Sequence, residues 1–194
     1  MKISARPVQL ALLRLCLAGL PLLAADTQLS YRIHPVSSAT AKVAVMGVSS
    51  KTAHFPKISG NVKFNPERLR TTSLDVNIDA RALKAGGGAT EKRLKGKDFF
   101  HVAKYPTVRF SGSSLTMSGK RTGRISGKLT ARGITRPVSF AVTFSAPPAQ
   151  AKKGQAVSLT ARTTINRRNF GMRAFSGVVG KQVSIRVNTR LKPL

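Results

Sequence analysis

The chain has 194 residues, of which 34 are Lys or Arg and 6 are Asp or Glu, giving a formal net charge of +28. This length suits one domain with a sizeable core. The single cysteine, Cys16, excludes an internal disulfide and a thiolate metal cluster. A charge of this size favours anionic partners such as nucleic acid, phosphate headgroups or an acidic envelope surface.

Residues 1–25 have the pattern of an export signal. Basic residues precede the apolar run 15–25, which is too short to span a bilayer. These basic residues are Lys2, Arg6 and Arg14. Cys16 follows Arg14-Leu15 and not the small residues of a lipoprotein box, which argues against lipidation. The sequence therefore predicts export of an unlipidated chain.

Cleavage after Ala25, or after Ala24, would leave a mature chain that begins near residue 26. Loss of the three basic residues of the leader leaves 31 basic and 6 acidic residues, a net charge of +25. We expect residues 26–194 to form one domain in a periplasmic or secreted protein.

An alternation of apolar and polar residues predicts strands along most of the mature chain. The expected strands are 31–33, 41–45, 58–64, 74–78, 108–110, 125–131, 138–144, 157–165 and 183–191. Turn signals separate them, as at 118–120 and 146–148. About eight strands with one apolar face favour an all-β fold, an eight-stranded antiparallel barrel of the up-and-down kind, because closure removes unpaired edges. A β-sandwich is the competing architecture.

Residues 80–105 interrupt the strand pattern. Residues 90–95 are expected to be helical, and Asp98 is placed to cap a single turn that carries Phe99 and Phe100. The sequence therefore predicts a short helical insert that covers one end of the barrel.

The polar residues form no recognisable catalytic or metal-binding pattern. His34, His54 and His101 lie in no such spacing, and the chain contains neither G-x-S-x-G nor H-E-x-x-H. Asp75 and Asp79 share the outer face of one strand, about 13 Å apart, which is typical of a solvated sheet face. We expect no catalytic residue, metal site or cofactor, and no enzymatic activity.

Basic residues occupy the face opposite the apolar set on most strands. They are Lys42, Lys63, Arg109, Lys128, Arg132, Arg162, Arg186 and Arg190. The phenylalanines of these strands point with the buried set, so the outer face lacks the aromatic platform on which nucleic-acid bases stack. Specific nucleic-acid binding is therefore not expected.

The apolar face has two interpretations. Alternating Val, Leu and Phe build the solid core of any half-buried strand. The adjacent Phe99 and Phe100 favour the second interpretation, because two neighbouring phenylalanines suit the mouth of an apolar cavity. An eight-stranded barrel can fill its interior or hold one elongated ligand.

Several segments, in order, resemble the YceI-like family of exported lipocalin-like barrels. They are Tyr31-x-Ile33, Gly60-x-Val62-x-Phe64, Leu94-x3-Asp98-Phe99-Phe100, Tyr105-Pro106 with Phe110, Gly127-x-Leu129-Thr130, Arg132-Gly133-Ile134-Thr135-x-Pro137-Val138, and Asn166-Arg167 with Phe170-Gly171. The first strand departs from the family pattern at His34, Ser37 and Ser38, and Lys42 stands where the family often has an apolar residue.

The resemblance implies a lipocalin-like barrel that binds, sequesters or transports a long amphiphile, such as a polyisoprenoid, an isoprenoid quinone or a fatty-acyl compound. We expect the lipid tail to lie against Val62, Phe64, Val76, Phe99, Phe100, Phe110, Leu129, Phe140 and Phe170, and Arg167 or His101 to meet the headgroup. The alternative is a protein whose basic surface docks on anionic envelope lipids or on nucleic acid. Monomer and homodimer both stay open.

Overall fold

The computed structural model describes residues 28–194, so the export signal expected at 1–25 lies outside the described residues. The strands are β1 (Leu29–Ile33), β2 (Ser38–Val45), β3 (Ser49–Phe55), β4 (Ile58–Phe64), β5 (Ser73–Asp79), β6 (Lys84–Ala85), β7 (Thr107–Met117), β8 (Thr122–Ala131), β9 (Ile134–Phe144), β10 (Val157–Asn166) and β11 (Val179–Pro193). The helix α1 spans Gly88–Lys95, and short 3-10 turns are η1 (Leu69–Thr71), η2 (Ala80–Ala82), η3 (Pro148–Gln150) and η4 (Arg167–Phe170).

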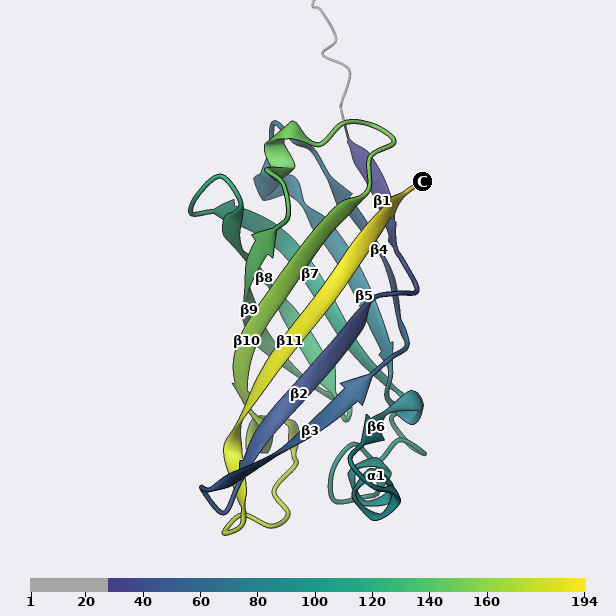
Figure 1. Cartoon of the computed structure of the whole chain (residues 1–194), viewed down its shortest axis with the longest axis vertical. Coiled ribbons are helices and arrows are strands. Elements are labelled where there is room, and N and C mark those ends of the chain that lie inside the picture. Colours follow the sequence, from purple (N-terminus) through teal and green to yellow (C-terminus); the bar gives the residue numbers. More distant parts are fainter. Residues whose placement is uncertain (1–27) are drawn as a thin grey trace, which may run out of the picture.

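All of these strands belong to one antiparallel sheet that closes on itself. The order is β1-β4-β5-β7-β8-β9-β10-β11, and β11 pairs back with β1. Closure confirms the eight-stranded barrel and excludes the sandwich. Figure 1 shows the long tilted strands of this barrel wrapping a common interior.

Three of the eight strand positions are each made of two strands. Ala39 faces Phe55 and Arg32 faces Asn61, so β1–β2 and β3–β4 form one long hairpin with nearly constant register. In the same way β6 continues β5, because β5 pairs with β4 and β6 pairs with β3. The alternation in the sequence did not predict β3.

The interruptions in this hairpin coincide with prolines. Pro35 lies between β1 and β2, and Pro56 lies between β3 and β4. Proline has no N–H to donate to a neighbouring strand, so it marks a break in the ladder. The β1–β2 bend is closed locally, because Ser37 N donates to the His34 carbonyl at 2.9 Å.

The barrel has two different ends, which we name by the segments that border them. The closed end carries η1, η3, the C-terminus and the turn between β7 and β8. The open end carries the β2–β3 turn, α1 and the segment between η4 and β11 (Figure 1). The helical insert therefore lies at one end of the barrel, as predicted.

The turn that follows α1 is closed by the backbone. Phe100 N donates to the Leu94 carbonyl at 3.0 Å, and His101 N donates to the Gly96 carbonyl at 2.9 Å. No side-chain hydrogen bond of Asp98 supports the expected cap among residues 28–194, so the turn forms as an extension of the helix end.

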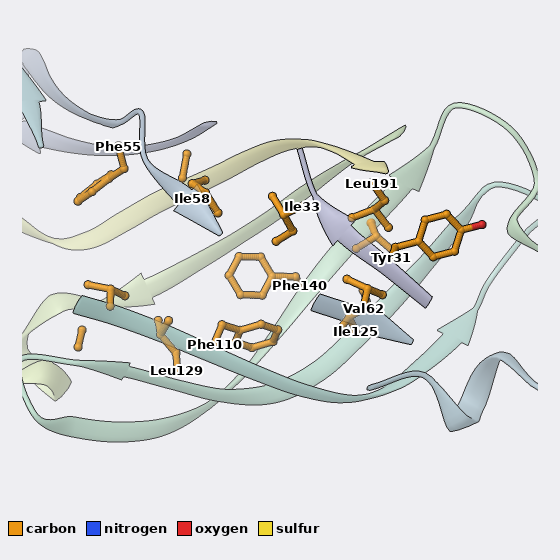
Figure 2. Packing of buried hydrophobic residues seen from close by; sticks show 14 of the residues in the cluster. Tyr31, Ile33, Phe55, Ile58, Val62, Phe110, Ile125, Leu129, Phe140 and Leu191 are labelled. Atoms are coloured by element: carbon orange, nitrogen blue, oxygen red, sulfur yellow. The ribbon is translucent and has the colours of Figure 1, made fainter. Parts of the chain in front are cut away.

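Large side chains interlock in the part of the barrel nearest the closed end. Tyr31 stacks on Phe64 with ring centroids 5.3 Å apart, and Phe110 meets Phe140 edge-on at 4.9 Å. Figure 2 shows Phe110 and Phe140 pointing toward one another, with Leu191 beside Tyr31. Pairs of this geometry add to the stabilisation that apolar burial supplies.

Gly60 allows two of these strands to approach closely. Its backbone has φ +150°, and a Cβ there would lie 2.0 Å from the Asp75 carbonyl oxygen of β5. Only glycine accepts both constraints. The glycine of the Gly60-x-Val62-x-Phe64 segment is therefore required by strand packing.

The outer face of the barrel is basic, as predicted, with one correction. The expected residues are exposed except Arg132, which lies in the β8–β9 turn with φ 52° and not on a strand face. Asp75 pairs with Arg109 and Asp79 with Arg81, so these two acids lie in surface ion pairs. No helix within residues 28–194 has the length and apolar character needed to cross a bilayer.

Candidate ligand-binding cavity

An elongated cavity of about 430 Å³ occupies the barrel interior. This volume lies within the range of about 300–1,000 Å³ that is usual for ligand pockets. Its wall reaches from Phe144 and Pro148 near the closed end to Val45 and Val178 at the open end. Of the two interpretations of the apolar face, the lined cavity therefore describes this interior better than a solid core.

Solvent reaches the cavity from the open end. Along the inner face of β2, Ala39 is buried, whereas Ala41, Val43 and Val45 are half-buried. The inner face of β11 shows the same gradient, from buried Leu191 to the half-buried residues nearer its start. The mouth therefore lies between the β2–β3 turn, α1 and the segment before β11.

Small side chains create this space. The cavity wall includes Ala39 and Ala41 of β2, Ala53 of β3, Ala131 of β8 and Ala161 of β10. A barrel of eight strands has just enough interior for large side chains to fill, so alanines on several strands leave a gap. The sequence did not predict that these alanines line a cavity, although the alanine-rich segment of β2 indicated small side chains on one strand.

Ten of the eleven residues predicted to bind a ligand line the cavity. They are Val62, Phe64, Val76, Phe99, Phe100, Phe110, Leu129, Phe140, Arg167 and Phe170. The exception is His101, which lies outside the lining and packs its ring edge-on against Tyr105 at 5.8 Å. The ligand-binding role of the ten stays a prediction, and His101 is not placed to meet a headgroup inside the barrel.

Arg167 is a buried cation on the cavity wall, only 3% exposed. Its Nε donates to the Gly180 carbonyl at 2.9 Å, Nη1 to Met172 at 2.6 Å and Nη2 to Val179 at 2.8 Å. Burial, with a further contribution from the nearby charge of Arg168, lowers the pKa of Arg167 from its usual value. An arginine nevertheless stays protonated in a protein, so this wall carries a permanent positive charge.

The sequence around Arg167 fixes its backbone. The Asn166 side chain accepts a hydrogen bond from Arg168 N at 3.0 Å, and Gly171 ends the η4 turn in the left-handed conformation. Phe170 is almost fully buried beneath this turn. The Asn166-Arg167 and Phe170-Gly171 motif therefore builds a tight turn that holds a guanidinium inside the barrel.

Two arginines and two phenylalanines form a stack at the mouth. Arg167 lies 5.8 Å from the Phe99 ring centroid, Phe99 stacks on Phe175 at 6.1 Å, and Arg93 lies 5.1 Å over Phe175. Such cation–aromatic and aromatic contacts are individually worth about 0.5–1.5 kcal/mol. The stack joins the helical insert to the segment before β11.

Arg132 makes a second connection between these segments. Its Nη1 donates to the Gly171 carbonyl at 2.5 Å, and its Nη2 donates to the Lys97 carbonyl at 2.7 Å. Gly133, the next residue, lets the Tyr105 ring approach, since a Cβ there would lie 2.7 Å from that ring. The expected surface charge Arg132 is thus a structural link at the open end.

Few of the residues that line the cavity are polar. Among the described residues, the polar ones in the lining are Thr40, Lys51, Thr52, Thr72, Thr90, Arg93, Arg167 and Thr189. Lys51 and Arg93 are exposed at the mouth, whereas Arg167 lies deeper. Within residues 28–194 no group of three His, Cys, Asp or Glu side chains is arranged to hold a metal ion.

The fold and the cavity define a class of protein, a closed eight-stranded antiparallel barrel with an apolar interior open at one end. The YceI-like domain matches residues 31–191, and the chain therefore belongs to the YceI-like family. Among curated relatives, a UPF0312 protein of Pseudomonas putida is 27% identical over 132 residues, which cover 68% of this chain and 69% of that protein.

Solved structures show the same fold. Burkholderia cenocepacia BcnA aligns with a TM-score of 0.72 and 23% identity, over 81% of this chain and 98% of that chain. A structure described as a polyisoprenoid binding domain from Saccharophagus degradans, implicated in plant cell wall breakdown, aligns with a TM-score of 0.66 and 12% identity, over 86% and 99%.

Proposed function

We propose that this protein binds one long amphiphilic lipid in its barrel and sequesters or transports it without catalysis. The observation that carries the proposal is the elongated cavity of about 430 Å³ with its predominantly apolar wall. The polyisoprenoid-binding description of the Saccharophagus degradans domain adds support. The candidate ligands are polyisoprenoids, isoprenoid quinones and fatty-acyl compounds, all of which carry a long apolar tail.

The cavity favours an elongated tail over a compact ligand. Its wall follows the inner face of β11 from Val179 to Leu191, a run of about 40 Å along the strand at the usual rise. Each methylene that leaves water contributes about 0.8 kcal/mol before the costs of association. A tail of ten or more carbons would therefore bind without a charged anchor.

The headgroup would stay at the open end. The mouth carries the exposed cations Lys51 and Arg93, and Arg167 places a third positive charge deeper on the wall. Three of the five N–H groups of Arg167 already donate to backbone carbonyls, so its contribution is chiefly the field of its charge. These groups favour a polar or anionic head, such as a carboxylate or phosphate.

The polar groups on the wall also support a binding role. The lining residues within 28–194 that carry polar side chains are threonines, lysine and arginines, with no carboxylate or imidazole to activate a hydroxyl. Proton transfer at a bound lipid would need such a base within hydrogen-bond reach. The expected location, periplasmic or secreted, would place this carrier among envelope lipids.

Filling the cavity tests the proposal without removing any native contact. Ala161→Phe puts a ring into the cavity, while Ala141→Phe adds the same ring to the exposed outer face of β9. A fluorescent fatty-acyl or polyprenyl probe should bind the parent protein and the Ala141 variant equally. The Ala161 variant should bind at least about tenfold more weakly, since displaced methylenes lose their burial.

Equal binding by both variants would place the probe outside the barrel. Thermal unfolding of each variant serves as the folding control, because the two substitutions lie on paired strands, β9 and β10. The basic-surface alternative predicts that probe binding weakens steeply with salt, whereas a buried tail is nearly indifferent to it.

A further inference from the structure

Large apolar side chains are exposed at one place in particular, the open end of the barrel. We name four of them the apolar tip: Met46 at 72% exposed, Val48 at 93%, Phe175 at 43% and Val178 at 44%. Within residues 28–194 the other large apolar side chains exposed to this degree are Val36 and Leu194, which lie apart from the tip. Gathered apolar exposure of this kind marks an interaction surface.

The apolar tip is one structural unit although it comes from two distant segments. Met46 N donates to the Val178 carbonyl at 2.8 Å, and Val45 pairs with Val179 directly beside it. Met46 and Phe175 both have left-handed backbones, with φ 51° and 55°. Non-glycine residues rarely adopt this conformation, and such strain collects at functional sites.

Exposed cations surround the apolar tip, and acids are missing from its two segments. The cations are Lys51, Arg93, Arg168, Arg173 and Lys181. Arg93 lies over the Phe175 ring, and Arg168 Nη2 approaches the Ser176 carbonyl at 3.5 Å. Every Asp and Glu of the chain lies at or before Asp98, so the whole C-terminal part that includes β7–β11 is free of acidic residues.

We propose that the apolar tip inserts into an anionic lipid bilayer, with the surrounding cations at the level of the phosphate headgroups. Apolar side chains beside Lys and Arg are the pattern of proteins that lie on membranes, and each cation near an anionic surface strengthens binding roughly fivefold. A second copy of this chain is a poorer occupant, because it would bring the same cations against this rim. Nucleic acid offers no apolar phase for exposed Val48.

Insertion would also orient the barrel. Phe175 and Val178 belong both to the apolar tip and to the cavity wall. Arg93, one of the surrounding cations, also lines that wall. A docked barrel would therefore press its mouth against the bilayer and give a lipid tail a path that avoids water. This last consequence rests on the proposed lipid-binding function, whereas docking itself does not.

Single tryptophans test the insertion directly, because the natural chain has none. Val48→Trp places a reporter in the apolar tip, and Val36→Trp places one at an exposed site of 69% away from it. With vesicles of phosphatidylcholine containing phosphatidylglycerol, emission from the first should move to shorter wavelength and be quenched by brominated acyl chains. Emission from the second should not change.

A pair of matched double variants measures the contribution of the apolar tip. Met46→Asn with Val48→Ser removes two exposed apolar side chains that do not line the cavity, and asparagine accepts the left-handed backbone of Met46. Val36→Ser with Leu194→Ser removes two of comparable exposure elsewhere. In vesicle flotation the first pair should weaken binding at least about tenfold and the second less than about twofold.

Three results would overturn docking by the apolar tip. Equal flotation of both double variants would assign vesicle binding to the basic wall alone. A change in Val48→Trp emission with protein concentration, without vesicles, would make a second copy the occupant. Binding to a DNA duplex that depends on Met46 and Val48 would make nucleic acid the partner.

The two proposals fail separately. The Ala161→Phe variant should lose the fatty-acyl probe and still float with anionic vesicles, while the Met46→Asn, Val48→Ser variant should keep the probe and stop floating. If the parent protein binds the probe but does not bind anionic vesicles, docking is overturned and the carrier function is not affected.

Discussion

The closed and open halves of the barrel share the same alternating strands but are stabilised by different contacts. Near the closed end, buried residues such as Tyr31, Phe64 and Val142 hold the strands by apolar packing. At the open end, Arg132 and Arg167 tie loops together by donating to backbone carbonyls. The cavity wall is half-buried at the end that these hydrogen bonds hold together and buried at the end that apolar packing holds together, so the cavity opens at the hydrogen-bonded end.

Removal of the Arg167 side chain should have the largest effect on this arrangement. Arg167→Met leaves the carbonyls of Met172, Val179 and Gly180 without their donor, at an expected cost of about 3 kcal/mol in the free energy of unfolding. Arg168→Met, at the exposed neighbouring position, should cost less than about 0.5 kcal/mol. Denaturant unfolding measures both.

Hydrogen exchange sharpens the same prediction. Amides of residues 171–180 should exchange faster in Arg167→Met, while those of β4 and β5 in the closed half stay protected. Uniform loss of protection over the whole barrel would show that Arg167 supports the entire fold and not the open half alone.

Matched valines compare packing in the two halves. Val142 is 2% exposed and lies outside the cavity lining, so Val142→Ala should cost about 2 kcal/mol through lost burial and a new void. Val183 is half-buried on the cavity wall, so Val183→Ala should cost about 0.5 kcal/mol because the space beside it is already empty. Similar losses at the two sites would mean that the open half is packed as tightly as the closed half.

Substitution of Tyr31 should raise the free energy of unfolding, whereas most substitutions of core residues lower it. Its ring is buried against Phe64, but within the described residues its hydroxyl has no hydrogen-bond partner, and burial raises the pKa of Tyr31. Tyr31→Phe keeps the ring and removes the unsatisfied group, so the protein should gain about 1 kcal/mol. A loss of stability on thermal unfolding would instead reveal a partner for the hydroxyl.

Acid should have the smallest effect, confined to the helical insert. A hydrogen bond from Arg81 lowers the pKa of Asp79, and one from Lys95 lowers the pKa of Glu91. Because the folded pKa values lie below the unfolded ones, this stabilisation is complete above pH about 4 and is lost as the pH falls through the folded values. Melting curves should therefore be flat from pH 8 to about 5 and decline below about 4.

The double variant Asp79→Asn, Glu91→Gln provides the control for that decline. It should flatten the acid limb of the melting curve and change little at neutral pH, since both ion pairs are partly exposed to solvent and screened by it. An acid limb that stays unchanged in the double variant would show that these two carboxylates do not cause the decline.

The fold was largely predictable because alternation reports the inner face of each strand. The exceptions are the two-residue β6 and β3. The latter begins with three exposed residues, Ser49, Ser50 and Lys51, so its apolar side appears only at Ala53 and Phe55. Pro35 and Pro56 carried the signal for the broken strands, but single prolines do not reveal which strands continue one another.

The cavity could be predicted only in part. Large residues such as Phe100 and Phe110 were identified because bulky apolar side chains are visible in a sequence, and both line the wall. The space itself comes from Ala41 and Ala161, and an alanine on an inner face looks the same whether its neighbour fills the gap or not. Arg167 was recognised as a polar residue near the ligand, but its burial and its three backbone acceptors needed the folded chain.

Native mass spectrometry of the protein, purified in high salt without added lipid, tests the proposed carrier function most directly. We expect a population heavier than the chain by the mass of one long-chain amphiphile, released by organic extraction and reduced in Ala161→Phe but not in Ala141→Phe. A folded protein that carries no lipid and binds no fatty-acyl or polyprenyl probe afterwards would contradict the proposed function.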